Sequence, residues 1–384
     1  AGVASIYTIF CLTDPSRGPR GASCFIAEID PANPPAGLQF PKKFDKMGIN
    51  ASETREIVLD GLEVRTENLI GGKPGRGFLQ AMGVFDVSRP MIGSMGVGLG
   101  RSAFEAALVY AHQRTQFGKP IIQFPGLRMM FVDMWLAIEG ARAMVLEGAR
   151  RVDRKYHDPG GSRDDVTAWS ACAKFMGSEA SRVSLEALQA TGGYGYMNET
   201  PFPKMVRDHK ILEIYEGTNQ IQREQAGRQF IKEFQARGTA APAELQAQGP
   251  AGAAAAALAW EVLDGTIRQA LLDESGEDSL GARQDVHWIL GEMGGLAESA
   301  RVLAQACAAC GEPAGHWLYT LGEVYARQAA LEAAARAERI LRGLGPRISP
   351  QMARTLERAR AAADGLFPLR DALGRVILEA TPAS

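Results

Sequence analysis

The sequence has little cysteine, no excess of charge of either sign and no long apolar run. Its five cysteines among 384 residues are scattered, which excludes a disulfide framework and favours a reducing compartment. The formal net charge of -2 argues against nucleic acid as a partner, because phosphate binding requires a basic surplus. The longest apolar stretch, residues 253–260, is much shorter than the ~20 residues that a membrane-spanning helix needs.

Metal-binding patterns are also scarce. Cys307 and Cys310 have CxxC spacing, but no second pair or nearby histidine set completes a zinc site, and the five histidines form no cluster. We therefore predict no metal and interpret the two cysteines as buried thiols of a helix.

Three zones of different pattern follow one another. Residues 1–70 hold short β-rich runs at 6–12, 23–29 and 56–59, separated by proline- and glycine-containing turns, and predict a partial small antiparallel β domain. Residues 71–235 have helical periodicity and predict a bundle. After a linker at 236–255, residues 256–384 predict a helical extension of three or four helices. The predicted fold class is α+β, mostly α.

Lysine is absent from the last zone. Residues 241–384 contain 13 arginines and no lysine, whereas all ten lysines lie before position 240. Either a domain boundary or genomic base bias explains this step.

Two apolar stripes define the helical zone. One runs from Val166 through Trp169 and Met176 to Ala187 at spacings of three and four, and predicts one helix with a buried face. A second stripe, from Phe131 to Val145, packs by the same logic. Two such helices joined by a loop are expected to be antiparallel neighbours.

The segment 207–223 carries the most chemistry. It places Glu216 before Gly217 in a turn that opens a helix, with Thr218 in its first turn. A carboxylate beside a glycine on such a turn can reach a substrate atom, and N–H groups at a helix start can polarise a carbonyl or hold phosphate. The alternative is that Glu216 only complements the helix dipole.

Several motifs together favour the catalytic reading. In chain order they are Lys46–Ile49 (KMGI), Leu69–Gly71 (LIG), Gly75–Phe78 (GRGF), Arg114–Lys119 (RTQFGK), Gln189–Tyr196 (QATGGYGY) and Tyr215–Thr218 (YEGT). Over residues 1–235 the chain thereby resembles the acyl-CoA dehydrogenase family. The resemblance implies the C-terminal helical bundle of that fold and FAD-dependent α,β-dehydrogenation of an acyl-CoA thioester.

By this resemblance, Glu216 is the base that removes the α-proton while the β-hydrogen leaves as hydride to the flavin. In some relatives the base lies on the earlier helix, at the place of Ser88, which is not an acid here and so favours Glu216. The resemblance also puts four residues at the substrate: Asp86, Arg89, Tyr215 and Gly217. For Asp86 and Arg89, a surface ion pair is the alternative.

The resemblance implies FAD as the cofactor and places seven residues on it: Arg114, Phe117, Gln189, Gly192, Gly193, Thr218 and Gln220. Arg114 would bind the pyrophosphate, because its planar fork can hold two phosphate oxygens. Phe117 and the 189–193 segment would meet the adenosine half of a neighbouring subunit's FAD, whereas Thr218 and Gln220 would contact the chain's own flavin. Without the resemblance, Gly192 and Gly193 form a helix C-cap.

The resemblance further implies an electron-transferring flavoprotein as electron acceptor, a homodimer or tetramer, and a bacterial cytoplasm or mitochondrial matrix as location. Relatives begin with a helical domain of about 100 residues, typical of a domain, and this chain opens after it. We expect a fragment, or a separate chain that supplies the missing half, and poor FAD binding by these residues alone. The alternative function is a non-catalytic or half-site subunit of a heteromeric complex.

The C-terminal extension resembles that of very-long-chain acyl-CoA dehydrogenases. Its arginine-rich part, residues 339–360, contains five apolar residues among the arginines: Ile340, Leu341, Leu344, Ile348 and Leu356. A solvated helix face is one interpretation, and a surface that lies on an anionic membrane is the other.

Overall fold

The computed structural model describes residues 2–158, 166–242, 252–272, 280, 283–311, 316–344 and 348–380. Its contacts divide the chain into two compact units, Ala1–Val87 and Ser88–Ser384. The described chain is mostly helical with a few short antiparallel strands, which confirms the predicted fold class. In the part that the structure describes, no helix combines the length and apolar character that crossing a bilayer requires.

The first unit is built on a β-hairpin. Strands β1 (Ile6–Leu12) and β2 (Ala22–Glu28) pair antiparallel, and the 3-10 helix η1 (Pro15–Gly21) connects them. A second short pair follows, and the 3-10 helix η2 (Thr66–Asn68) precedes the first long helix. The second pair consists of β3 (Leu38–Gln39) and β4 (Val58–Leu59). A small core of Ala27, Ile29 and Leu38 packs in this unit. The runs predicted at 6–12, 23–29 and 56–59 agree within two residues with β1, β2 and β4, whereas β3 was not predicted.

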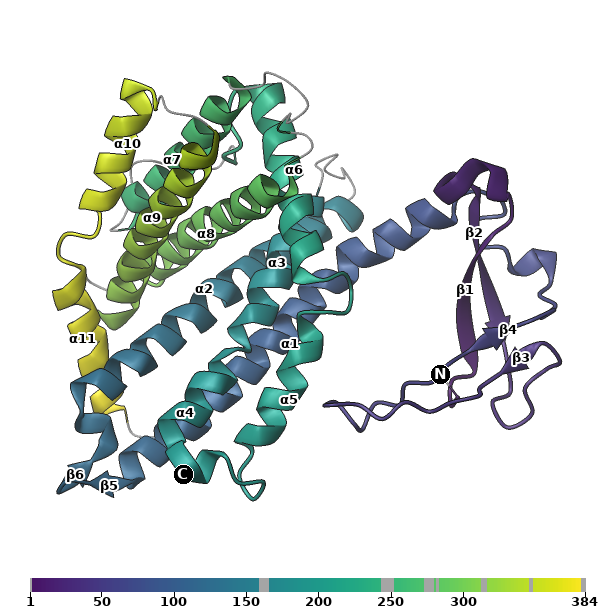
Figure 1. The fold of residues 1–384 in the computed structure, drawn as a ribbon, viewed down its shortest axis with the longest axis horizontal. Helices are drawn as coiled ribbons and strands as arrows, with labels where there is room; N and C mark the ends of the chain where they lie inside the picture. Colours follow the sequence, from purple (N-terminus) through teal and green to yellow (C-terminus); the bar gives the residue numbers. More distant parts are fainter. Residues whose placement is uncertain are drawn as a thin grey trace. The chain divides into compact units, whose positions relative to one another are not determined.

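The second unit is a helical bundle (Figure 1). Helix α1 begins in the first unit and ends in this one. The helices are α1 (Gly77–Gln113), α2 (Pro125–Tyr156), α3 (Thr167–Ala180), α4 (Val183–Gly195), α5 (Phe202–Leu212), α6 (Asn219–Arg237), α7 (Ala253–Leu272), α8 (Gln284–Ala309), α9 (Trp317–Leu344), α10 (Pro350–Ala361) and α11 (Leu366–Glu379). A two-residue hairpin of β5 (Thr115–Gln116) and β6 (Lys119–Pro120) separates α1 from α2.

Glycine lets α1 approach α3 very closely. A Cβ atom at Gly93 would lie 2.3 Å from the carbonyl oxygen of Ala173, and one at Gly96 would lie 2.2 Å from that of Gly177. No larger side chain fits at either position without moving a backbone. This close crossing fixes the second-unit part of α1 against the helix that follows α2.

The predicted helix from Val166 to Ala187 is wrong in one respect, because the structure divides it at Ser181 and Arg182. There the chain makes bonds between residues three apart, Arg182 N–H to Glu179 and Leu185 N–H to Arg182, which form a 3-10 turn. A single tight turn moves the apolar stripe little. The stripe is therefore continuous in sequence although the helix is not.

Helices from both helical zones share one core. Trp169 of α3, Phe230 of α6 and Trp260 of α7 are buried and meet edge to face, with ring centroids 5.6 to 6.3 Å apart. Helix α8 packs against α6, α7 and α9 (Figure 1). The domain boundaries at 70, 235 and 255 stay predictions, and the predicted linker lies partly outside the described residues.

The extension buries three of the apolar residues that suggested a membrane surface. Ile340, Leu341 and Leu356 are each 3% exposed and pack in the helical core, whereas Ile348 is 40% exposed. The membrane surface stays a prediction. Of the CxxC pair, Cys307 is buried but Cys310 is exposed, so the prediction of two buried thiols is correct only for the first.

A buried charge network joins α2 to α8. Glu147 accepts hydrogen bonds from Arg150 at 2.6 Å and from Arg151 at 2.7 Å, and Arg151 also donates to Glu298 at 2.9 Å. Burial alone would raise the pKa of Glu147. The bond from Arg150 and the nearby arginine charges hold that pKa below its ordinary 4.5 instead.

This shift predicts a pH dependence of stability. Because the folded state lowers the pKa of Glu147, its stabilising effect is complete above pH 4.5 and is lost as pH falls through the folded value. The Glu147→Gln variant should be less stable at neutral pH and should lose less stability on acidification. Urea unfolding over a pH series measures both. Parallel curves for the two proteins would contradict the prediction.

Candidate active site

The turn between α5 and α6 holds Glu216 in an unusual backbone conformation. Glu216 has φ of 58° and Gly217 has φ of 89°, both in the left-handed region. Thr218 then caps α6, accepting a bond from the backbone N–H of Ile221 at 3.4 Å. The helix therefore opens where the sequence predicts. Glycine is favoured at 217 because of this positive φ, and a Cβ there would also displace the side-chain amide of Gln222, 2.3 Å away.

Two side chains hold Glu216 by hydrogen bonds, one to its carboxylate and one to its backbone carbonyl. Ser88 Oγ, on α1, donates to Oε2 of Glu216 at 2.6 Å. Gln222, fully buried on α6, donates from Nε2 to the backbone carbonyl of Glu216 at 3.3 Å. Glu216 itself is half-buried, so its carboxylate is fixed yet reachable from outside.

The start of α6 is anchored to α3 by a buried polar cluster. Asn219 Oδ1 accepts from Lys174 Nζ at 2.8 Å and from Ser178 Oγ at 3.1 Å. Lys174 is fully buried, and this burial lowers its pKa to about 8 although the charges of Glu213 and Glu216 oppose the shift. The cluster ties the turn that carries Glu216 to α3.

Three of the predicted substrate residues, Arg89, Tyr215 and Gly217, lie at the same turn. Arg89 is buried, and a Cβ at Gly217 would lie 3.9 Å from its NH2. Tyr215 is half-buried and donates from its hydroxyl to the sulfur of Met95 at 3.7 Å. Asp86 is buried as well, so neither it nor Arg89 is an exposed surface ion pair. Their contact with CoA stays a prediction.

The predicted adenosine-side residues form a second group. Phe117 and Gly118 have φ of 50° and 80° and make the tight turn between β5 and β6, with Phe117 91% exposed at its tip. The guanidinium of Arg114 lies 5.7 Å from the ring centroid of Tyr194. This contact brings the hairpin beside the glycine-rich end of α4.

That end of α4 is open. Gly192, with φ of 63° and ψ of -146°, breaks the regular helix, and α4 then ends at Gly195. A Cβ at Gly192 or Gly193 would meet nothing within 4 Å, and Gln189 is exposed. Gly192 therefore ends a helical segment, as the alternative reading holds, and it also leaves room for a ligand. Gln220 is exposed on the first turn of α6.

Residues 75–231 match the family described as "Acyl-CoA dehydrogenase, C-terminal domain". This segment is therefore similar to that domain of acyl-CoA dehydrogenases. This match includes Glu216 and all of the predicted site residues, and it agrees with the resemblance seen in the motifs.

Curated relatives share this part of the chain. A probable acyl-CoA dehydrogenase of Mycobacterium leprae is 37% identical over 231 residues, which are 60% of this chain and 57% of the relative. The short-chain specific acyl-CoA dehydrogenase of Megasphaera elsdenii is 39% identical over 222 residues, or 58% and 55%. The chain thus spans little more than half the length of these relatives.

Solved structures of acyl-CoA dehydrogenases have the same fold. An acyl-CoA dehydrogenase complexed with FAD from Bacillus anthracis has a TM-score of 0.81 and 23% identity, over 98% of this chain and 67% of that chain. Butyryl-CoA dehydrogenase from Megasphaera elsdenii has a TM-score of 0.54 and 38% identity, over 59% and 56%. Because the Bacillus anthracis structure aligns with 98% of this chain, the alignment includes the C-terminal helices.

A further similar chain comes from a study of the electron transferring flavoprotein of Acidaminococcus fermentans. It has a TM-score of 0.53 and is 37% identical, over 59% of this chain and 56% of that chain.

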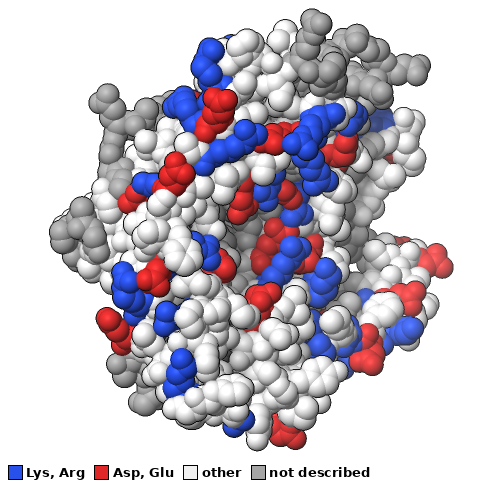
Figure 2. Space-filling view, turned by 60° about the vertical axis from the view of Figure 1, so that its left-hand side comes forward, with Lys and Arg blue, Asp and Glu red and all other residues white. Residues whose placement is uncertain are grey.

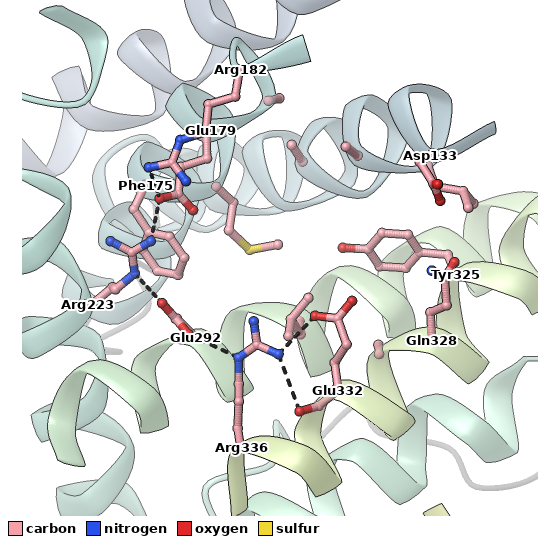
Figure 3. Close-up of a pocket in the computed structure, with 17 residues that line it drawn as sticks. Asp133, Phe175, Glu179, Arg182, Arg223, Glu292, Tyr325, Gln328, Glu332 and Arg336 are labelled. Atoms are coloured by element: carbon pink, nitrogen blue, oxygen red, sulfur yellow. Dashed lines mark hydrogen bonds and ion pairs between the residues drawn. The ribbon is translucent and has the colours of Figure 1, made fainter. Parts of the chain in front are cut away.

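A separate cavity of about 440 Å³ lies between α2, α3, α8 and α9. Figure 3 shows a row of ion pairs across it, in which Glu292 bonds Arg223 at 2.7 Å and Arg336 at 3.0 Å. Basic and acidic side chains alternate on the face drawn in Figure 2 as well. Since the charges of the cavity row pair with one another, they join α6, which lies in the matched segment, to α8 and α9.

Sequence reasoning missed Lys174, Asn219 and Gln222 as parts of the site. One signal was present, because Lys174 is a lone lysine within the apolar stripe of α3, and such a charge is buried only with a partner. Among the described residues, no group of histidine, cysteine and carboxylate side chains could hold a metal ion.

Proposed function

We propose that this acyl-CoA dehydrogenase domain takes part in FAD-dependent α,β-dehydrogenation of an acyl-CoA thioester, with Glu216 as the α-proton base. One observation carries the proposal: Glu216 stands half-exposed on a left-handed turn with one carboxylate oxygen held by Ser88. Within the described residues its other oxygen, Oε1, accepts no hydrogen bond. That oxygen is available to take a proton.

The turn also supplies a donor for the developing charge. Removing an α-proton moves negative charge onto the thioester oxygen, and preorganised N–H donors stabilise such an oxyanion. The backbone N–H of Glu216 donates to no described residue. It therefore suits this role while the carboxylate of the same residue holds the proton. A bound flavin supplies the acceptor for the β-hydrogen, which leaves as hydride.

The residues present fit an FAD. Arg114 offers a planar guanidinium, the Cβ positions of Gly192 and Gly193 face open space, and Phe117 projects an exposed ring. This group would hold the adenosine and pyrophosphate half. Thr218, at the cap of α6, and Gln220 would contact a flavin beside Glu216. Phe117 and the segment around Gly192 and Gly193 would contact the FAD of a neighbouring subunit in a homodimer or tetramer.

We predict that Arg114→Gln weakens FAD binding by about tenfold to a hundredfold, because a charge-assisted bidentate contact to phosphate is lost. Titration of the apoprotein with FAD, followed by flavin fluorescence, measures the dissociation constant. Arg207→Gln, on the exposed face of α5, is the matched control. Equal affinity in Arg114→Gln and the control would remove Arg114 from the FAD site.

Anaerobic addition of acyl-CoA to the FAD-loaded protein tests the function. Bleaching of the flavin absorbance supports the proposal, and the chain length that bleaches fastest identifies the substrate class. The alternative, a non-catalytic or half-site subunit, predicts no bleaching until a second chain is added. Reoxidation by an electron-transferring flavoprotein tests the proposed acceptor.

A further inference from the structure

The carboxylate of Glu216 receives a hydrogen bond from a residue that is distant in sequence. Ser88, on α1, lies 128 positions earlier, and its Oγ donates to Oε2 at 2.6 Å. Bonds from a hydroxyl to an ionised carboxylate are short and strong. Both residues belong to the second unit.

We propose that Ser88 is a positioning residue for Glu216: its hydroxyl fixes Oε2 and thereby aims Oε1 at the substrate. This inference rests on the proposed role of Glu216 as base. Ser88 itself contacts no reacting atom in this account, because it acts only through the carboxylate that it holds.

The conformation of the turn explains why such a contact is needed. A residue other than glycine in the left-handed region persists only where its surroundings impose that conformation. Gln222 fixes the backbone of Glu216 through its carbonyl. The side chain, however, retains three rotatable bonds, and a glutamate has much rotamer freedom to lose. Among the described residues, Ser88 supplies the one hydrogen bond to this carboxylate.

The helix that carries Ser88 is packed closely against α3 just after that residue. Gly93 and Gly96 pack α1 directly against the backbone of α3, and Lys174 of α3 binds Asn219 at the start of α6. The hydroxyl and the turn are thus tied to the same helix from two sides. A fixed donor opposite a fixed turn leaves one orientation for the carboxylate.

The test compares Ser88→Ala and Ser88→Thr with the wild type. Ser94→Ala is the matched control, because Ser94 is exposed on the same helix and its hydroxyl bonds only the carbonyl of Met91. In the FAD-loaded protein, Ser88→Ala should slow bleaching by acyl-CoA about tenfold, as expected for loss of one hydrogen bond to a charged group. The acyl-CoA concentration for half-maximal rate should not change. Ser88→Thr should restore the rate.

A second measurement requires neither flavin nor substrate. The carboxyl carbon of the Glu216 side chain, followed by carbon-13 NMR, should shift in Ser88→Ala relative to the wild type, Ser88→Thr and Ser94→Ala, because the hydrogen bond to Oε2 is lost. A wild-type bleaching rate in Ser88→Ala would overturn the proposal. If the wild type itself does not bleach, the proposed function fails, and the carboxyl signal alone decides the role of Ser88: an unchanged signal in Ser88→Ala then overturns it.

Discussion

Replacing Glu216 with glutamine should abolish flavin bleaching by acyl-CoA while leaving the flavin bound. Glutamine has the shape of glutamate, and its carbonyl oxygen can still accept the bond from Ser88. It cannot accept a proton. Because a positioned base contributes about 10²- to 10⁴-fold to a rate, the loss should be of that size. Stopped-flow absorbance measures the bleaching rate, and the flavin content of the purified variant measures binding.

The matched control for this variant is Glu186→Gln. Glu186 is an exposed carboxylate in the first turn of α4, and it should bleach like the wild type. If Glu216→Gln loses its flavin, the residue is needed for flavin binding, which contradicts the predicted result. If it keeps both its flavin and its rate, the base lies elsewhere.

Replacing Glu298 with alanine should destabilise the helical bundle by about 3–5 kcal/mol, the cost of removing one carboxylate from a buried charge network. Glu298 is fully buried on α8. It accepts bonds from Arg301 at 2.8 Å and from Arg151 of α2 at 2.9 Å. The substitution leaves Glu147 as the carboxylate that both guanidinium groups share, so two buried positive charges face one negative charge. Urea unfolding of the two proteins measures the difference in free energy.

The control for this effect is a surface pair. Glu105 bonds Arg101 one turn away on α1, and both side chains are largely exposed. Glu105→Ala should change the free energy of unfolding much less than Glu298→Ala, because solvent screens exposed pairs. Equal losses in the two variants would show that the α2–α8 network contributes no more than a surface ion pair does.

The fold class could be predicted from periodicity, since burial of an apolar face imposes it on the sequence. The stripes on α2 and α3 are buried as predicted. The break at Ser181 and Arg182 could not be seen, because a single 3-10 turn hardly rotates the apolar face. The sequence also did not predict that the two helical zones share one core. That core depends on contacts such as Trp169 with Trp260, which join residues from different zones of the sequence.

The candidate site shows a similar limit. The YEGT motif identified the turn, and the resemblance identified the role of Glu216. The bond from Ser88 depends on how α1 lies against α3, which no local pattern reveals. From the resemblance alone, Ser88 is notable only because it is not an acid at a place where some relatives carry the base. The structure adds that its hydroxyl contacts the carboxylate.

The most direct test of the central claim follows the α-hydrogens of the substrate. The FAD-loaded protein is incubated anaerobically in D₂O with an acyl-CoA, and mass spectrometry measures deuterium at the α-carbon. If Glu216 removes the α-proton, the wild type should incorporate deuterium and Glu216→Gln should not. Incorporation at the wild-type rate in Glu216→Gln would contradict the account.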